Sequence, residues 1–522
     1  MLALVQRPLR AAFDLAELLL SRVFSPQWNP LLNLGALGFF FYWVITASGV
    51  YVYIFFDTGI TQAYSSVEYM TNDQWYAAGV MRSLHRYASD GLIVAMLLHL
   101  LHEFANDRYR GARWFSWITG LPVIVLVYAA GISGYWLVWD RLAQYVAIVS
   151  TEWLDRLPIF GQPIARNFLS PDTLESRFFT LMVFMHIAIP LIALILLWLH
   201  LQRITKPRIN PPLGLLIGSG LSMIVLSLLY PAVSQGPADL AQVPGTVGLD
   251  WFYLPAFPII ETLPGPATWG GAGILALIML AIPWLPPMKR AAPATVDLAN
   301  CNGCRRCAQD CPYSAIMMQP RTDALPFEAE AVVDPSLCVS CGICAGACPT
   351  STPFRRKSEL VPGIDLPDRS IAALRAETDK EGGRISGTAR IIVFVCENAG
   401  VNALIRSDSV GTVAVNCSGH LPPSFIDYVL SRRLADGVVI AGCGPNACHN
   451  RFGGTWTQQR LDRQRDPYLR ARVPRERFLV IWGHHGLERD LKAFAEALRQ
   501  LPSPSPKPAR AGIVHAAEMH DA

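Results

Sequence analysis

The sequence predicts a membrane-embedded all-α bundle of six transmembrane helices, followed by a cysteine-rich α+β domain and a small α/β domain with a parallel sheet. Of the 522 residues, 52% are hydrophobic and 16% are charged, which is apolar for a soluble protein. The long apolar stretches all precede residue 288, and the twelve cysteines all follow residue 300. From residue 389, short apolar runs alternate with helix-like stretches, which is typical of a parallel α/β sheet.

Six apolar stretches are long enough to cross a bilayer, which takes about 20 helical residues. They cover residues 33–56, 79–104, 117–139, 177–202, 213–232 and 268–287. The loops 105–114 and 203–210 and the N-terminal segment are basic, so the positive-inside rule places both termini in the cytoplasm, in a multi-pass protein of the inner (cytoplasmic) membrane. Residues 1–24 are typical of an amphipathic helix and lack a signal-peptide cleavage site. The net charge of +4 indicates no nucleic-acid partner.

Composition divides the chain into five segments. They are a transmembrane domain at 1–288, a cysteine-rich domain at 296–353, a charged linker at 354–388 with a short helix near 368–380, an α/β domain at 389–500 and a disordered tail at 501–522. The strand-like runs of the α/β domain are RIIVFV, TVAVN, GVVIAG and FLVIWG. Cysteines in CxxC-type runs are typical of metal ligation in a reducing compartment, which places this tail in the cytoplasm.

Four histidines in the predicted spans repeat at one spacing. His85 and His99 lie in the second span, and His186 and His200 in the fourth, 14 residues apart in each case. Fourteen residues advance a helix by about 21 Å and nearly four turns, so both histidines of a span face one direction at two depths. Two facing helices then form two bis-histidine sites, as electron-transfer haems use. Helix-to-helix hydrogen bonding is the alternative, and it explains a lone membrane histidine better than four at matched spacing. We interpret His102 as a neighbour rather than a ligand.

Glycines repeat at the same spacing as the histidines. Gly35 and Gly49 in the first span, and Gly120 and Gly134 in the third, are also 14 residues apart. Glycine suits a helix that a flat macrocycle must approach closely, although helix packing is an alternative for either pair. Arg82, near the outer end of the second span, is a candidate partner for a haem propionate, with a snorkelling arginine as the alternative.

The cysteine-rich segment contains the run CxxCxxCxxxCP twice. In this motif the first three cysteines of a run hold one [4Fe-4S] cluster and the fourth crosses to the other cluster. The first cluster is expected on Cys301, Cys304, Cys307 and Cys348, and the second on Cys338, Cys341, Cys344 and Cys311. Structural zinc is the alternative, which the CP endings and the count of eight cysteines disfavour.

Four further cysteines follow the predicted strands of the α/β domain. Cys396, Cys417 and Cys443 lie where apolar runs end, and Cys448 follows in the run GCGPNACH. Because parallel strand ends converge at one edge of a sheet, these four thiols are expected to meet there. They predict a third cluster, a [2Fe-2S] centre, with buried free cysteines as the alternative.

Most of residues 1–288 resembles the cytochrome b family of quinol-oxidising respiratory and photosynthetic complexes. The resemblance rests on MRSLHRYASDGLIVAMLLHLLHEF, on ISGYWLVW and on the HxxxP run of the fourth span. It implies two haem b groups in the bundle, an outer one on His85 and His186 and an inner one on His99 and His200.

The loop LDWFYLP is similar to the family's PEWYFLP at the outer quinol site. This similarity implies that Asp250 is the catalytic residue that accepts a proton from quinol. Trp251, Phe252 and Tyr253 are then expected to form an aromatic wall around its carboxylate. An aromatic belt at the membrane interface is the alternative for this run.

The tail carries two further resemblances. Residues 296–353 resemble bacterial two-cluster ferredoxins, which implies a ferredoxin-like α+β domain. Residues 389–485 resemble the delta subunit of methyl-viologen-reducing hydrogenase, in FVCENAG, VNCSGHLPP and GCGPNACHNRFG. This second resemblance implies electron exchange with soluble heterodisulfide-reductase-like, hydrogenase-like or other dehydrogenase subunits. Ala399 stands where that family has a second cysteine, which leaves the ligand set of the third cluster open.

These observations together predict an oxidoreductase subunit that transfers electrons between the quinone pool in the lipid membrane and a soluble redox partner. The sequence has no GxGxxG run after a strand, so the chemistry of a nicotinamide or flavin is expected on another subunit. Two alternatives stay open. One is an electron-bifurcating quinol oxidase, and the other is a membrane anchor without quinone turnover.

Overall fold

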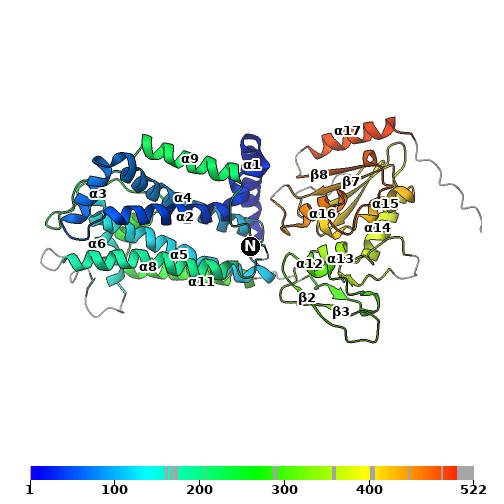
Figure 1. The fold of residues 1–522 in the computed structure, drawn as a ribbon, viewed down its shortest axis with the longest axis horizontal. Coiled ribbons are helices and arrows are strands. Elements are labelled where there is room, and N and C mark those ends of the chain that lie inside the picture. The colour runs from blue at the N-terminus through cyan, green and yellow to red at the C-terminus, as the bar shows by residue number, and fades with distance from the viewer. Residues whose placement is uncertain are drawn as a thin grey trace, which may run out of the picture.

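The computed structural model describes residues 2–157, 163–164, 175–204, 206–285, 291–355, 360–399, 406–444, 447–483 and 486–502, together with residues 159 and 169. A helical bundle lies at one end of the molecule, and two smaller domains lie together at the other (Figure 1). The predicted disordered tail lies outside the described residues from 503 onward.

The bundle is built from long helices joined by short ones. The described helices of this region are α1 (Leu2–Trp28), α2 (Leu34–Phe55), α3 (Gln62–Asn72), α4 (Val80–Ala105), α5 (Trp114–Val138), α6 (Arg141–Asp155), α8 (Ser176–Leu201), α9 (Leu213–Leu229), α10 (Phe257–Thr262) and α11 (Gly265–Ala281). Helix α2 packs along α4, and α5 packs along α8. Each histidine-bearing helix is therefore paired with a glycine-bearing one.

Five described segments are long and apolar enough to cross a membrane. They are Pro30–Phe55, Trp75–Ala105, Gly111–Val138, Ser176–Leu201 and Gly265–Trp284. The stretch predicted at 213–232 forms α9, an apolar helix of 17 residues that ends at Leu229. It is shorter than predicted because Pro231 follows, and proline disfavours the helical conformation of the residue before it.

Helix α1 lies across the end of the bundle that faces the smaller domains (Figure 1). It contains the predicted amphipathic helix, and Leu4, Val5 and Leu19 on it are exposed apolar residues. Its polar side is attached to the bundle by Glu17, which lies 2.8 Å from Nε2 of His102. The helix is therefore suited to rest on a membrane surface while bound to α4.

The cysteine-rich domain consists of two small antiparallel pairs and two short helices. Strand β1 (Thr295–Val296) pairs with β4 (Ile364–Asp365), and β2 (Ile316–Pro320) pairs with β3 (Ala329–Val333). The helices are α12 (Arg306–Gln309) and α13 (Ile343–Ala347). Cysteines of both runs share one core with Ile316, Ala331, Ile364 and Leu366. The core is small, so bound clusters would supply much of its interior.

The C-terminal domain has a parallel sheet in the order β6-β5-β7-β8, as predicted for an α/β domain. Its elements are α14 (Ile371–Arg384), β5 (Ile391–Cys396), β6 (Val410–Val415), α15 (Ser424–Ser431), β7 (Gly437–Gly442), α16 (Gly453–Leu461), β8 (Phe478–Trp482) and α17 (Leu487–Gln500). Helix α17 packs on one face of the sheet, and α14 and α15 pack on the other. Coverage of both faces explains the continuous apolar strands.

The two smaller domains are joined by a buried ion pair. Asp310, between two cysteines of the first run, lies 2.5 Å from Nη2 of Arg460 on α16. Both side chains are nearly inaccessible, and Arg465 also binds Asp310. Arg460 donates a further hydrogen bond of 3.0 Å to the Gly419 carbonyl. Since a buried charge requires a partner, Asp310 fixes the cysteine-rich domain on the C-terminal domain.

Candidate functional site

The imidazoles of His85 and His186 face each other between α4 and α8, with ring centroids 6.1 Å apart. A metal ion bound to both rings at about 2 Å would separate their centroids by roughly 6 Å. Nδ1 of His85 lies 3.0 Å from the Ile45 carbonyl, and Nδ1 of His186 lies 3.0 Å from the Ala130 carbonyl. A carbonyl only accepts, so each Nδ1 carries the proton and each Nε2 keeps its lone pair. The geometry fits bis-histidine ligation of iron.

Glycines of α2 and α5 lie against all four histidines. A Cβ built at Gly49 or at Gly134 would lie only 2.9 Å from Cε1 of the facing imidazole. The corresponding distances are 3.2 Å at Gly120 and 3.7 Å at Gly35. Three of the glycines follow a hydroxyl residue that bonds to the same ring, in Ser48–Gly49 at His85, Ser133–Gly134 at His186 and Thr119–Gly120 at His200. The glycines therefore make room for the imidazoles themselves.

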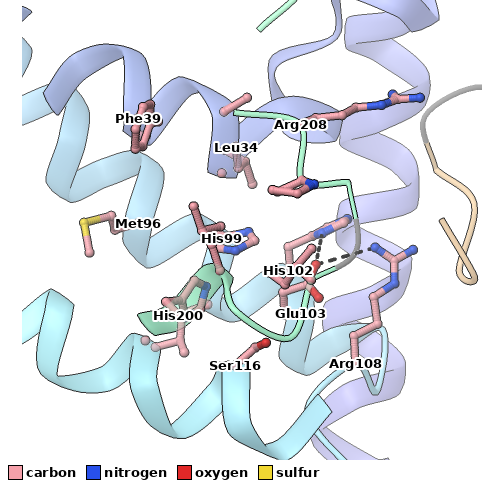
Figure 2. Close-up of a pocket in the computed structure, with 18 of the residues that line it drawn as sticks. Leu34, Phe39, Met96, His99, His102, Glu103, Arg108, Ser116, His200 and Arg208 are labelled. Carbon is pink, nitrogen blue, oxygen red and sulfur yellow. Dashed lines mark ion pairs between the residues drawn. The ribbon is translucent and has the colours of Figure 1, made fainter. Parts of the chain in front are cut away.

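His99 and His200 line a cavity of about 430 Å³, which residues of the smaller domains also line. They lie side by side on α4 and α8, with Phe39 and Met96 on the apolar side of the cavity (Figure 2). Charged residues gather toward the other end, where Glu103 and Arg108 form an ion pair with 3.5 Å between Oε1 and Nη1. This gradient suits a flat apolar macrocycle with two carboxylates at one edge.

The C-terminal domain forms part of the wall of this cavity. Cys448, His449 and Arg451 line it together with the two histidines. Arg113, at the start of α5, donates to the Tyr313 hydroxyl at 2.5 Å and to the His449 carbonyl at 2.6 Å. Burial, together with Arg113 and other nearby guanidinium groups, lowers the pKa of His449 well below its usual value. The loop that carries Cys448 is therefore bound directly to the membrane bundle.

The eight cysteines of the two runs form two groups. Cys301, Cys304, Cys307 and Cys348 line one small cavity. Cys344 has Cys311, Cys338 and Cys341 as its main electrostatic neighbours. Each group thus contains three cysteines of one run and the last cysteine of the other, and it matches an expected ligand set.

Burial favours the protonated thiols of Cys307 and Cys341 when no cation is bound. It raises the pKa of Cys307 to about 12, and the neighbouring Cys348 adds to the shift. It also raises the pKa of Cys341 to about 12. Several thiolates at such close range need positive charge among them, which iron ions supply. The donor sets therefore fit iron–sulfur clusters.

The four cysteines of the C-terminal domain form a ring of thiols at one edge of the sheet. Cys396 ends β5 and Cys443 follows β7, with 3.8 Å between their sulfur atoms. The thiol of Cys417 forms hydrogen bonds with those of Cys396 and Cys448, and the thiol of Cys448 forms one with that of Cys443. Tetrahedral thiolate ligands at about 2.3 Å from a metal lie roughly 3.8 Å apart, which is the separation of the Cys396 and Cys443 sulfur atoms. Strands β5 and β7 flank the topological switch point of the sheet, where such sites form.

Hydrogen bonds from Cys417 and Cys443 lower the pKa of Cys396 to about 4, while the pKa of Cys417 rises. The ring therefore shares its protons unequally, as closely spaced thiols must when no cation lies among them. Ala399, where the related family has a cysteine, is buried beside Cys396 and Cys443. Cys448 lies five residues after Cys443, interacts with Cys417 and Cys443, and completes a set of four.

Comparison with known families agrees with the division of the chain into a membrane bundle, a cysteine-rich domain and a C-terminal domain. Residues 19–207 match the family model of cytochrome b/b6/petB. The membrane half carries a cytochrome b region. Residues 300–352 match the 4Fe-4S dicluster domain, and residues 391–501 match the delta subunit of methyl-viologen-reducing hydrogenase. All three resemblances expected from the sequence are confirmed.

A solved structure titled as a hyperthermophilic respiratory Complex III is similar to this chain, with 19% identity and a TM-score of 0.38. The match covers 49% of this chain and 74% of that one. The cytochrome b region implies haem b, and the dicluster domain implies [4Fe-4S] clusters. The chain is a membrane electron-transfer protein.

Asp250 follows the matched cytochrome b region in the chain and has different neighbours from those expected. Trp251 and Phe252 are 69% and 52% exposed, so they do not form a wall around its carboxylate, and only Tyr253 of the three is buried. Instead, Oδ2 of Asp250 lies 2.6 Å from Nη2 of Arg86 and also accepts a hydrogen bond from the Tyr135 hydroxyl. The predicted aromatic wall is wrong because the turn after Asp250 leaves the consecutive side chains of Trp251 and Phe252 exposed, while the carboxylate binds the partly exposed Arg86.

Two other predicted residues have defined partners. Arg82 donates to Thr71 and, at 2.9 Å, to Ser234, and it lies 3.8 Å from Glu68. Its assignment to a haem propionate stays a prediction. His102 lies on α4 with its ring directed to Glu17 on α1, which agrees with its interpretation as a neighbour of the ligands.

Sequence reasoning missed three features of the site. The first is the ion pair of Arg86 with Asp250, since no sequence pattern links two residues that are 164 positions apart. The contribution of Arg451 to the His99–His200 cavity has no local signal either. The hydroxyl–glycine dipeptides could have been found, because SG or TG recurs at 48–49, 119–120 and 133–134.

Proposed function

We propose that this protein carries electrons between membrane quinone and a soluble redox partner, through two haem b groups, two [4Fe-4S] clusters and a third cluster of the [2Fe-2S] type. One observation carries the proposal. The cavity between His99 and His200 is also lined by Cys448, a member of the third thiol set. The predicted haem ligands and the predicted iron–sulfur ligands therefore lie in one continuous structure rather than in separate tethered domains.

The ligand sets follow one another along the molecule. Cys417 of the thiol ring shares a small apolar cluster with Ile343, which lies between two ligands of the second cubane site. In the expected ligand sets, the second cubane site takes Cys311 from the first cysteine run, and the first cubane site takes Cys348 from the second run. Among the twelve cysteines, all of which the structure describes, Cys304 of the first cubane site is the exposed one. This order supports a path from the bundle outward to solvent.

When bound, the haems and clusters supply one-electron redox chemistry. The chain's own residues hold these groups at fixed positions and exclude water from them. Helices α2 and α5 orient the imidazoles through carbonyl and hydroxyl groups, as in the contact of Ile45 with His85. The arginines of the loop before α5, through Arg113, fix the C-terminal domain against the cavity.

Quinol oxidation is proposed at the His85–His186 end of the bundle, beside Asp250. Its carboxylate is held by Arg86 and Tyr135, and Asp90 lies 3.6 Å from Nε of the same arginine. A carboxylate fixed near a haem site can accept a proton as quinol is oxidised. Arg86 would hold this carboxylate in position and stabilise its negative charge.

We propose that the soluble partner docks beside Cys304, on the dicluster domain. The heterodisulfide-reductase-like or hydrogenase-like identity of that partner follows from the resemblance of residues 391–501. The basic residues Arg108 and Arg113 lie on the same end of the bundle as the cysteine domains. This placement supports an inner-membrane protein with its iron–sulfur tail in the cytoplasm.

Anaerobic stopped-flow spectroscopy with a soluble quinol tests the proposal. Quinol should reduce haem first and the clusters next in the purified full-length protein. His200→Ala should stop cluster reduction by quinol while dithionite still reduces the clusters. His102→Ala is the control, because it removes an imidazole of α4 that binds Glu17 on α1, and it should leave cluster reduction intact. If quinol reduces neither haem nor clusters in the wild type, the protein is a membrane anchor without quinone turnover.

A further inference from the structure

His420 is a fully buried histidine whose two ring nitrogens have no hydrogen-bond partner among the described residues. It ends the 3-10 turn Ser418–His420, which begins directly after Cys417 of the thiol ring. Buried polar atoms of folded proteins are almost always hydrogen-bonded, so an imidazole without a partner requires an explanation. His420 lies between the thiol ring and the cysteine loop that contains Gly342, so its missing hydrogen-bond partner is expected at one of these two cysteine sites.

Two glycines bring this turn against the ligand loop of the second cubane site. Gly342, two residues before Cys344, has a φ of +78°, and a Cβ there would lie 2.5 Å from Cγ of His420. A Cβ at Gly346, in the following helix, would lie 2.0 Å from the Gly419 carbonyl oxygen. Any side chain at either glycine would push the turn away. The sequence therefore holds the imidazole in contact with the loop that binds the cluster.

The imidazole of His420 is neutral, because burial lowers its pKa to about 3 and Arg369 adds to this shift. A neutral imidazole has one N–H donor and one acceptor nitrogen. Arg369 bonds elsewhere, to Glu377 at 2.8 Å and to the Ala414 carbonyl. The donor of His420 thus needs an acceptor that the described protein atoms do not supply. The sulfur atoms of an iron–sulfur cluster accept such hydrogen bonds.

We propose that His420 donates a hydrogen bond to the [4Fe-4S] cluster held by Cys311, Cys338, Cys341 and Cys344, and thereby raises its reduction potential. The inference rests on the cluster assignment in the proposed function. A reduced cluster carries one more negative charge than an oxidised one, so the hydrogen bond is stronger in the reduced state. His420 is a positioning residue that tunes this cluster.

An EPR-monitored redox titration of the full-length holoprotein tests this role. His420→Leu removes the donor at similar volume and should make reduction of the second cubane about tenfold less favourable, which is about 59 mV for a one-electron couple. His420→Gln keeps an N–H donor and should restore part of the shift. Thr378→Val, a buried substitution on α14, is the control and should leave every potential unchanged. An unchanged cubane potential in His420→Leu with full iron content would overturn the inference, as would a shift confined to the third cluster.

A second measurement needs no variant. In protein labelled with ¹⁵N-histidine, electron spin echo spectroscopy should detect a nitrogen coupling to the reduced second cubane. The four histidines predicted as ligands bind haem, so they do not contribute to this signal. Absence of the coupling in a protein with intact cubanes refutes the role of His420. Absence of the cubanes themselves in the wild type refutes the proposed function instead.

Discussion

Gly49→Ala and Gly134→Ala are expected to release haem from the His85–His186 site. A Cβ at either position would lie 2.9 Å from Cε1 of the facing imidazole. Ordinary contact begins near 3.4 Å, so the ring must move by about 0.5 Å, whereas metal–ligand bonds tolerate only about 0.2 Å. Loss of ligand support typically weakens metal binding about 10–100-fold. Alanine favours helix over glycine by about 1 kcal/mol, so a weaker helix cannot explain the loss.

The pyridine haemochrome assay gives the haem content, and EPR of the low-spin ferric state separates the two sites. Gly35→Ala is the matched control, because it makes the same substitution in the same helix as Gly49 at a distance of 3.7 Å from His99. It should retain both haems, and Gly120→Ala, at 3.2 Å from His200, should be intermediate. If Gly35→Ala lost as much haem as Gly49→Ala, the contact distances would not govern haem binding.

Three further predictions concern buried charge, proton transfer and pH. Asp310→Ala leaves the inaccessible Arg460 without its partner and should destabilise the joined soluble domains by about 3–5 kcal/mol in denaturant titration; a loss below 1 kcal/mol would contradict it. Asp250→Asn should slow quinol-dependent haem reduction about a hundredfold with both haem spectra intact, and an unchanged rate would exclude this site. Burial raises the pKa of Cys307 from 9.0 to about 12, so the unfolded chain loses this proton first as pH rises. The cluster-free protein should therefore lose stability between pH 9 and 12, and a flat pH profile would argue against a buried thiol.

Local patterns in the sequence predicted much of the architecture. The spacing of His85 and His99 was visible because a helix repeats every 3.6 residues, so 14 residues return to the same face. The first strand of the α/β domain was visible as a run of apolar residues, since a strand covered on both faces buries every side chain. The cysteine runs predicted two crossed ligand groups, and the structure places Cys348 with the cysteines of the first run.

Other features needed the folded chain. Helix α9 was predicted too long, because hydropathy alone does not register where Pro231 interrupts the helix. The surroundings of Asp250 were predicted from its sequence neighbours, whereas its carboxylate binds Arg86 and Tyr135 from two other helices. Contacts between residues more than a hundred positions apart leave no periodic signal in one sequence.

The sequence by itself therefore determined which residues can hold the redox groups and on which elements they lie, because ligand type and helical or strand periodicity are local properties. The tertiary structure alone decided how these sites join. It brought Cys448 to the cavity of His99 and His200, and it brought His420 onto the loop of Gly342. Such placements depend on the packing of whole domains against each other, through buried groups such as Asp310 and Arg460, and packing is specified only by the three-dimensional fit of distant surfaces.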